Sequence, residues 1–299
     1  MFIIILVGYF IRQKGLITDV QVKAFNKVIF TVCFPCLSFD NIYGKNISGA
    51  DYKVVWITLL ALAIIYVLGT IVVLSIEKDS KSRGAMIQAI YRSNVVIMGI
   101  SMVQNLFGSD IDISITAILI AIVVPIYNVL AVITLEIYRG GKPNFKDIFI
   151  SIATNPIILG SLAGILAVIC GLTLPEVLHK PIAALSGSAS PMALLVLGAS
   201  FNLKSLNSNK RNVTVCVVAR LVIAPAIGLF LLYNAGVRGV PMATAVAIFA
   251  SPTAVASYTM AQQMDSNGDL AGECVVVSSL FSCFTMFLWV FILKCTGLI

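Results

Sequence analysis

Residues 247–263 read AIFASPTAVASYTMAQQ, an apolar stretch that contains a helix-start signal. Serine is a favoured N-cap, and proline is tolerated in the first helical turn, where its missing N–H costs no hydrogen bond. The stretch lies inside the uncharged run 239–264, which is long enough to cross the hydrocarbon core of a membrane. A helix start at Ser251 and Pro252 therefore predicts a span that is broken near mid-membrane.

The chain as a whole is apolar enough to reside in lipid. Hydrophobic residues make up 59% and charged residues 11% of its 299 positions, and its mean hydropathy is +1.02, values that exclude an ordinary soluble protein. A spanning helix needs about 20 mostly apolar residues. Six uncharged runs meet this length, and three more do so if one or two polar residues are allowed: 54–76, 113–135, 148–175, 181–203, 239–264 and 274–293, then 25–43, 84–107 and 212–235.

A tenth apolar segment, residues 1–11, is too short to span. We interpret it as the second half of a first helix that is truncated in this sequence, which does not say whether the true start lies upstream of Met1. A signal peptide fits less well, because no basic region precedes the segment and no small-residue cleavage site follows it. We therefore predict an all-α polytopic membrane protein with ten transmembrane helices in one domain, residues 1–299.

Two landmarks recur at one spacing and indicate an internal repeat. Gly8 and Gly164 are 156 residues apart, and so are Pro35 and Pro191. The chain then divides into halves of five helices, residues 1–138 and 147–299, and an odd number of helices per half turns the second half upside down. Inverted repeats of this kind are typical of secondary transporters.

The positive charge of the chain is explained by topology. The net charge is +7, yet the basic residues are scattered over short loops without a basic helix, so no nucleic-acid partner is expected. Lys and Arg concentrate in alternate loops, which the positive-inside rule places in the cytoplasm. Both termini are then outside a plasma or bacterial inner membrane. The cation-rich loops contain Arg12, Lys14 and Lys23; Lys78, Lys81 and Arg83; Arg139, Lys142 and Lys146; and Lys204, Lys210 and Arg211.

A second break is predicted in residues 89–101, which read AIYRSNVVIMGIS. Ser93 and Asn94 lie near the middle of this span, and Asn94 can cap a half-helix that begins at Val95. Because the predicted helices 4 (residues 84–107) and 9 (residues 239–264) occupy equivalent positions in the two halves, their breaks are expected to meet. Each second half-helix would present unpaired N–H groups and a positive dipole end, which together suit a carboxylate.

Neither broken helix carries Asp or Glu at its midpoint, which disfavours a cation or proton antiporter built on paired carboxylates. The structural alternative is that Pro252 only kinks its helix and that the serine, threonine and asparagine groups only join helices.

Other polar positions complete the candidate substrate site. Asn128 could contact substrate or serve as interhelical glue, and Arg92 could attract substrate or extend to the cytoplasmic face. Arg220 is too deep to do so and needs a partner, which we interpret as a structural ion pair. The candidate substrate-binding residues are Ser93, Asn94, Asn128, Asn155, Ser251, Pro252, Thr253, Ser257 and Gln262.

No metal, cofactor or catalytic group is expected. The single histidine, His179, lies in a predicted external loop, and the seven cysteines sit mostly in apolar runs, including the Cys33/Cys36 pair. No Ser/His or Asp/Asp constellation lies at helix depth, so an intramembrane enzyme is disfavoured. A coupling ion, either H⁺ or Na⁺, is left open.

These segments resemble the auxin efflux carrier family, whose bacterial members include malate and malonate carriers. The resemblance lies in Leu6-Val-Gly-Tyr-Phe10, Arg92-Ser-Asn94, Asn155-Pro156 and, most specifically, residues 251–263. It implies the fold of the bile acid:sodium symporters, with ten helices in inverted repeats and crossing broken helices 4 and 9. By the same resemblance, substrate would lie against Asn94 and the 251–253 turn, with helices 2 and 7 lining the path. Members often carry proline in helix 4, where this chain has Val95 and Val96.

The function predicted from the sequence is transport of a small mono- or dicarboxylate across the lipid bilayer by alternating access. The alternative is a membrane receptor or sensor that binds the same anions without moving them. The sequence is compatible with a homodimer but does not specify the oligomeric state.

Overall fold

The computed structural model describes residues 1–45, 51–140, 144–201 and 203–299, with no account of the side chains at 203–205 and 207. Lys142, one of the predicted cytoplasmic cations, lies outside the described residues. The described chain is mainly helical and contains no β-strand. Its helices are α1 (Phe2–Gln13), α2 (Asp19–Val28), η1 (Ile29–Cys33), α3 (Phe34–Asp40), α4 (Tyr52–Ile76), α5 (Ser80–Tyr91), α6 (Val95–Phe107), α7 (Ser114–Ile137), α8 (Phe145–Thr154), α9 (Pro156–Ile169), α10 (Glu176–Ser200), α11 (Leu203–Val218), η2 (Ala219–Ile223), α12 (Ala224–Asn234), α13 (Val240–Ala250), α14 (Val255–Gln263) and α15 (Gly268–Cys295).

Among the described residues, six continuous helical stretches are long and apolar enough to cross a membrane, or seven if α8 and α9 form one bent span. The six are Asp19–Asp40, Tyr52–Ile76, Ser114–Ile137, Glu176–Ser200, Ser208–Asn234 and Gly268–Cys295. Helices α1, α6 and α13 are apolar but shorter. Large apolar side chains such as Trp56, Phe145 and Phe284 are exposed on the outer surface, as expected for a chain that faces lipid.

The predicted span 148–175 is wrong as one continuous helix. The chain bends by 60° between α8 and α9. Pro156 cannot donate a backbone hydrogen bond to α8, and the side chain of Asn155 accepts from the backbone N–H groups of Ile157 and Ile158, so that a new helix starts at Pro156. Asn155 is therefore an N-cap at a third interruption of the helical chain.

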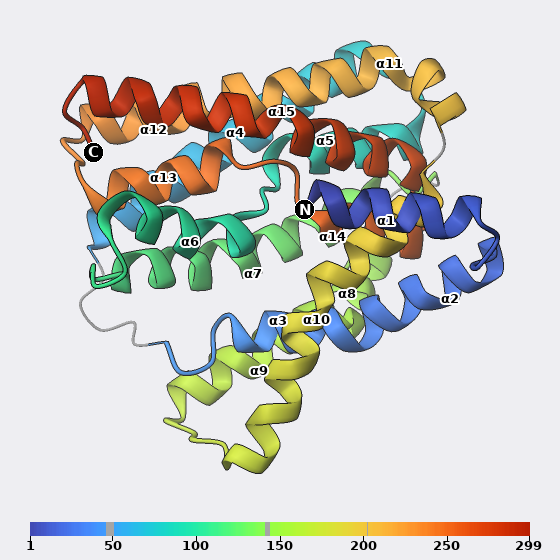
Figure 1. The fold of residues 1–299 in the computed structure, drawn as a ribbon, viewed down its shortest axis with the longest axis horizontal. Coiled ribbons are helices and arrows are strands. Elements are labelled where there is room, and N and C mark those ends of the chain that lie inside the picture. The colour runs from blue at the N-terminus through green and yellow to red at the C-terminus, as the bar shows by residue number, and fades with distance from the viewer. Residues whose placement is uncertain (46–50, 141–143, 202) are drawn as a thin grey trace.

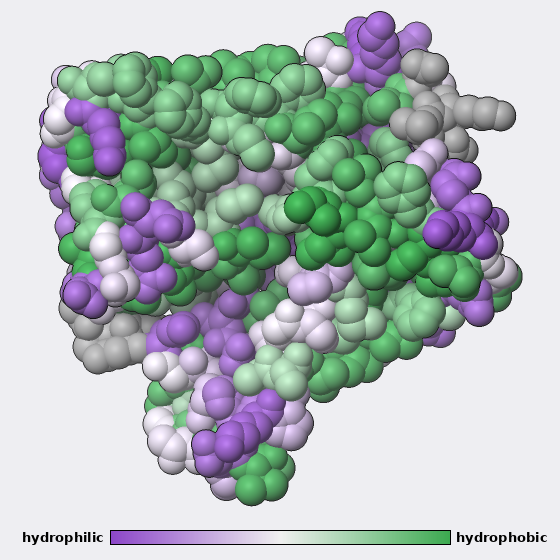
Figure 2. Space-filling view, viewed as in Figure 1, coloured by the Kyte–Doolittle hydropathy of each residue, from purple (hydrophilic) through white to green (hydrophobic). Residues whose placement is uncertain are grey.

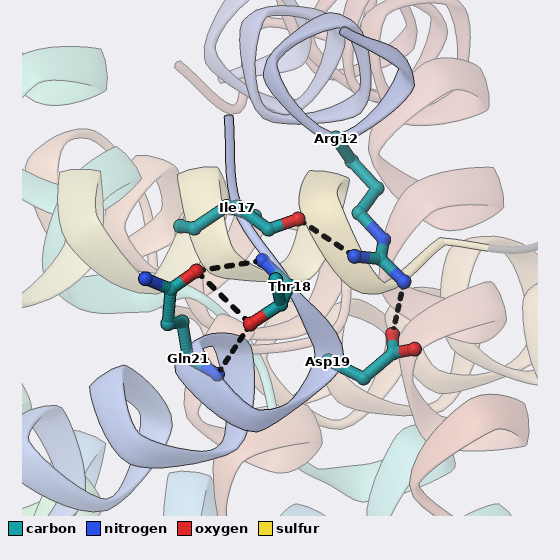
Figure 3. Close-up of polar contacts among 5 residues, drawn as sticks. All are labelled: Arg12, Ile17, Thr18, Asp19 and Gln21. Carbon is teal, nitrogen blue, oxygen red and sulfur yellow. Dashed lines mark hydrogen bonds and ion pairs between the residues drawn. The ribbon is translucent and has the colours of Figure 1, made fainter. Parts of the chain in front are cut away.

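The turn between α1 and α2 is fixed by a set of polar contacts (Figure 3). Thr18 and Gln21 form a capping box at the start of α2, in which each side chain bonds to the backbone of the other. Arg12 at the end of α1 reaches the same turn, where it donates to Asp19 at 2.5 Å and to the Ile17 carbonyl at 2.6 Å. These contacts set the direction in which the chain re-enters the bundle.

The helices form two groups that meet along α7 and α14 (Figure 1). The first group packs α1 and α3 against α10 and α9, around a core that includes Ile5, Ile29 and Leu197. The second group packs α4, α5, α6, α11, α12, α13 and α15 around a core that includes Leu62, Ile87 and Phe249. Residues of α7 contribute to both cores.

Two close helix crossings hold the first group together through glycine. A Cβ atom on Gly8 of α1 would lie 2.1 Å from the carbonyl oxygen of Leu195 in α10. A Cβ on Gly164 of α9 would lie 2.9 Å from the carbonyl oxygen of Phe39 in α3. Small residues allow backbones to approach this closely in membrane helices, where packing is a main source of stability.

Candidate functional site

Two helix breaks meet in the interior, where residues 92–94 and 251–254 form what we call the crossover. Helix α5 ends at Tyr91 and α6 begins at Val95, while α13 ends at Ala250 and α14 begins at Val255. Between them, Ser93 and Thr253 form an isolated antiparallel bridge. The helices are therefore interrupted in both segments that the sequence indicates.

The crossover is held by two reciprocal backbone hydrogen bonds. The N–H of Asn94 donates to the carbonyl of Pro252 at 2.9 Å, and the N–H of Ala254 donates to the carbonyl of Arg92 at 3.1 Å. Each break thus supplies the partners that the other break lost when its helix stopped, as buried backbone groups require.

The predicted caps at both breaks are wrong in detail. Asn94 occupies the N-cap position of α6, but its side chain makes no capping hydrogen bond. Ser251 ends α13 instead of starting the next helix, and α14 starts at Val255 after an extended segment that includes Pro252. The physical reason is that strand-like pairing across the crossover keeps residues 251–254 extended, which delays the second helix by several residues.

Arg220, in the π-helical segment η2, braces the crossover from behind. Its five N–H donors match five carbonyl oxygens at 2.7–3.2 Å, and all five lie at the C-terminal ends of α5 and α13. The predicted ion pair is therefore wrong, since the partners are backbone carbonyls. Each helix end carries about −0.5 charge, so the two ends together offset the guanidinium charge. The carbonyls belong to Ile90, Tyr91, Ile248, Phe249 and Ser251.

A cavity with both polar and apolar side chains in its wall opens at the crossover between the two groups of helices, and we call it the first cavity. Its volume is about 50 Å³. Figure 2 shows hydrophilic surface in the hollow between the α6–α7 region and the α3–α9–α10 region. The N-terminal turns of α6 and α14 both contribute to its wall. The lining residues are Phe34, Leu37, Ser38, Asn41, Arg92, Ser93, Asn94, Val96, Val124, Tyr127, Asn128, Ile157, Ser190, Ala254, Val255 and Ala256.

Arg92 lines the first cavity and is 4% exposed. Its Nη1 lies 2.9 Å from Oε1 of Gln88 and 2.7 Å from the sulfur of Met260, and its Nη2 donates to Oδ1 of Asn128 at 2.6 Å. The alternative that Arg92 extends toward the cytoplasm is therefore wrong, because the side chain is fixed inside by neutral groups.

Three of the nine candidate residues, Ser93, Asn94 and Asn128, line the first cavity. Ser93 shares a hydrogen bond with the hydroxyl of Tyr127 at 3.2 Å. Asn128 donates weakly to the hydroxyls of Ser38 and Ser161, at 3.4 and 3.5 Å. These side chains come from four regions of the fold: the break between α5 and α6, and helices α7, α3 and α9.

Four other candidates are buried at or behind the crossover and do not line the cavity: Ser251, Pro252, Thr253 and Ser257. Thr253 donates through its hydroxyl to the carbonyl of Ala89 at 2.9 Å, and its N–H donates to Ser278. The hydroxyls of Ser251 and Ser257 are buried without a hydrogen-bond partner. Their positions indicate packing and backbone pairing as their contribution in this conformation.

Gln262 lies in a different place, a second and more open cavity with a volume of about 780 Å³. This cavity is lined at one end by the start of α2 and at the other by the end of α14. Asn155, as described above, caps α9 and is absent from the lining of both cavities. The lining residues of the second cavity are Asp19, Val22, Lys23, Asn26, Lys27, Lys81, Ser200, Tyr258, Gln262, Gln263, Asp265, Ser266 and Asp269.

No group of three His, Cys, Asp or Glu side chains that could hold a metal ion occurs within the described part of the chain. The functional groups that sequence reasoning missed are Gln88, Tyr127 and the carbonyl cluster around Arg220. Gln88 and Arg92 are one helical turn apart, a spacing that places them on one face and could have indicated their contact.

Comparison with known proteins places the chain in a transporter family. The profile described as "Membrane transport protein" matches residues 1–144 and 144–290. An uncharacterized transporter of Methanothermobacter thermautotrophicus is 23% identical over 297 residues, which cover 96% of this chain and 94% of that protein. One of Methanocaldococcus jannaschii is 23% identical over 305 residues, covering 97% and 96%.

A third relative, which matches less than half of the chain, is named for a substrate. A Rhizobium meliloti protein named "Putative malonate transporter" is 28% identical over 137 residues, which cover 45% of this chain and 42% of that protein. Taken with the match of the profile over nearly the whole chain, the comparisons support the resemblance seen in the sequence. The chain belongs to the membrane transport protein family, of the auxin efflux carrier type.

Proposed function

We propose that this protein is a carrier that moves a small organic anion across the membrane by alternating access. The observation that carries the proposal is that both helix breaks open onto one cavity, whose wall includes polar side chains and the N-terminal turns of α6 and α14. Unpaired N–H groups and positive dipole ends favour a carboxylate at such a place. Ser93 and Asn94 supply polar side chains beside these ends.

The architecture we propose has ten spans in two inverted repeats, residues 1–138 and 147–299. Short α1 is the first span, α5 with α6 the fourth, α8 with α9 the sixth, and α13 with α14 the ninth. The glycine crossings support this pairing: Gly8 meets Leu195 and Gly164 meets Phe39, and 164 minus 8 and 195 minus 39 both equal 156. Contacts that recur with their partners exchanged are expected of two halves related by a twofold axis.

The crossover supports the same relation. Asn94 donates to Pro252, and Ala254 donates to Arg92. The positions 94 and 254 differ by 160, and so do 92 and 252, so that each hydrogen bond is the image of the other. The offset of 160 instead of 156 requires only four extra residues between the first helices and the crossover in the second half.

Two cavities at different depths support alternating access. Within the span Asp19–Asp40, Asn26 lines the second cavity, whereas Phe34 and Ser38 line the first. Lys27 also lines the second cavity, so seven residues separate the two linings, a distance of about 10 Å at about 1.5 Å per residue. The buried residues Ile29 and Phe30 lie between them. A carrier needs such a barrier between two access routes, on alternate sides of a central site.

For substrate we propose a small mono- or dicarboxylate, in keeping with the partial relative whose name refers to malonate. The second cavity would open to the cytoplasm, both termini would lie outside, and the membrane would be the plasma or bacterial inner membrane. Transport would require no enzymatic step and no cofactor, and H⁺ or Na⁺ would serve as any coupling ion.

Uptake by purified protein in sealed vesicles tests the proposal. We expect labelled malonate or another small carboxylate of a panel to accumulate inside, and Asn94→Ala to reduce the initial rate at least tenfold. Asn234→Ala, an exposed asparagine at the end of α12, is the matched control and should keep wild-type rates. Accumulation of no carboxylate would refute the carrier, and saturable binding without accumulation would favour the receptor alternative.

A further inference from the structure

Arg92 is a buried charge whose partners in the described chain are all neutral side chains. Among the described residues, which include every Asp and Glu of the chain, none forms an ion pair with Arg92. An arginine keeps its charge at all physiological pH values. A buried guanidinium without a counter-charge is costly in a medium of low dielectric, and such residues in membrane proteins mark ion and substrate sites.

Arg220 provides the internal comparison, since it is also fully buried and also lacks an acidic partner. All five of its donors reach carbonyl oxygens at two helix C-termini, whose partial negative charges offset its own. Arg92 is the C-cap residue of α5, but its guanidinium bonds only to side chains and to no helix-end carbonyl within the described chain. The half-helix ends that line its cavity are N-termini, so the dipoles there add to the positive potential.

The contacts of Arg92 leave it able to bind a further group. Gln88, Met260 and Asn128 engage both Nη1 hydrogens and one Nη2 hydrogen. Within the described chain, the Nε hydrogen and the second Nη2 hydrogen have no acceptor, and the residue lines the first cavity. Nε and Nη2 lie on one edge of the planar guanidinium, the edge that binds a carboxylate through two parallel hydrogen bonds.

We propose that Arg92 is the residue that binds the carboxylate of the transported anion in the first cavity, with Gln88 and Asn128 as positioning residues that hold its guanidinium in place. The proposal rests on the proposed function and adds to it the group that makes the site select anions. Asn128 then acts through Arg92 and is not itself a substrate contact, which differs from the role predicted for it from the sequence.

Asn128→Asp is the decisive variant, because it keeps the shape of the side chain. It replaces the amide whose Oδ1 lies 2.6 Å from Nη2 of Arg92 by a carboxylate. The new carboxylate would neutralise Arg92 and compete with substrate. We expect the variant to raise the thermal midpoint of the ligand-free protein and to weaken malonate binding, read as the malonate-induced shift of that midpoint, at least tenfold. Asn234→Asp adds the same charge at an exposed position and should change neither quantity.

Arg92→Gln and Arg92→Lys complete the test. Loss of a charge-assisted, two-point hydrogen bond is expected to raise the KM for malonate uptake about 10- to 100-fold in Arg92→Gln. Arg92→Lys should restore part of this loss, since a lysine keeps the charge but not the planar two-point geometry. Uptake of chloride, measured in the same variants, distinguishes a general anion site from a carboxylate site. Arg92→Lys should strongly reduce uptake only for a carboxylate, because only a carboxylate uses the two-point geometry.

The outcomes separate this inference from the function it rests on. If wild-type protein accumulates carboxylates and Asn128→Asp binds malonate as tightly as wild type, Arg92 is structural and the inference is overturned while the carrier stands. If wild-type vesicles accumulate no carboxylate, the proposed function itself is at fault. Should Arg92→Gln fail to fold, Asn128→Asp and Arg92→Lys still test the inference, because both keep a positive charge at residue 92.

Discussion

The guanidinium of Arg220 donates through Nε to the carbonyl oxygen of Ser251 at 2.9 Å, at the residue where α13 stops. The same guanidinium reaches the carbonyls of Ile90 and Tyr91 at the end of α5. One side chain thus joins the two helix ends that break at the crossover. Because buried carbonyls without partners are costly, a break in mid-membrane needs such a donor, and Arg220 supplies five at once.

Replacing Arg220 should therefore destabilise the protein strongly. Arg220→Met leaves five buried carbonyls without their donor, and each unsatisfied group costs about 1–3 kcal/mol. We expect a loss of at least about 3 kcal/mol and a fall in Tm of about 5–10 °C, measured on purified protein in detergent. Arg220→Lys should recover only part of the lost stability, because a lysine has three N–H donors on a single nitrogen and cannot reach all five carbonyls.

Arg238→Met is the control for Arg220, because Arg238 also donates to backbone carbonyls but at the exposed end of α12. Its Tm should stay within about 2 °C of wild type, in keeping with the small effect of most surface substitutions. Equal losses of Tm in the two variants would contradict the brace that we assign to Arg220.

Ser251→Ala tests a residue that the sequence places in the substrate site. Its hydroxyl is buried with no partner and lies outside the lining of the first cavity. Removing an unsatisfied hydroxyl should leave uptake near wild type and keep or slightly raise Tm, because no hydrogen bond is lost. Ser93→Ala, which removes a cavity hydroxyl bonded to Tyr127, should slow uptake severalfold. A large loss of uptake in Ser251→Ala alone would indicate that the Ser251 hydroxyl contacts substrate during transport.

The positions of the breaks could be predicted because their signals are local. Ser251-Pro252 and Asn94 interrupt otherwise apolar runs, and a residue that favours a cap at such a point indicates an interruption. What these residues bond to could not be predicted, because the partner of Asn94 is Pro252, which is remote in sequence and bonds through a carbonyl that every residue possesses.

The partners of Arg220 escaped prediction for the same reason. An arginine in an apolar run indicates that a partner exists, but backbone carbonyls have no sequence signature, and an acidic residue is the usual expectation. The bend at Asn155 is different, since Asn-Pro is a clear start signal. The sequence nevertheless predicts one long span over residues 148–175, because hydropathy alone does not register a change in the direction of the chain.

Gly198 should tolerate no side chain. A Cβ at this position in α10 would lie 2.0 Å from the carbonyl oxygen of Ile5 in α1, so Gly198→Ala forces the two backbones apart. We expect a loss of about 1–3 kcal/mol, the usual range for overpacking, seen as a lower Tm. Gly187→Ala in the same helix meets nothing within 4 Å and should be neutral or stabilising by up to about 1 kcal/mol. Equal effects would mean that α1 does not pack closely on α10.

Asp79 should make the stability of α5 depend on pH. The hydrogen bond from Ser82, where α5 starts, is the main reason that the pKa of Asp79 lies below its ordinary value. The stabilisation from the ionised carboxylate is therefore complete above about pH 4 and is lost as pH falls through the lowered pKa. Asp79→Ala should cost about 1 kcal/mol at pH 7 and less near pH 3, followed by Tm. Asp79→Asn keeps a cap without the charge, so it should cost less than Asp79→Ala at pH 7, and its difference from wild type should shrink as pH falls through the lowered pKa.

Lysines in the second cavity should speed the approach of an anion. Of its three aspartates, Asp19 pairs with Arg12 and Asp265 with Arg139, so that Lys23 and Lys27 leave the region positive. Attraction between an anion and these side chains is screened within about 8–10 Å at physiological salt. Replacing both by Gln should therefore raise the KM from this side about threefold to tenfold at low ionic strength and hardly at all at high salt. Lys294→Gln, at the end of α15 and outside both cavity linings, should leave KM unchanged at either salt concentration. A salt-independent rise in the double variant would indicate a direct contact with substrate in place of long-range attraction.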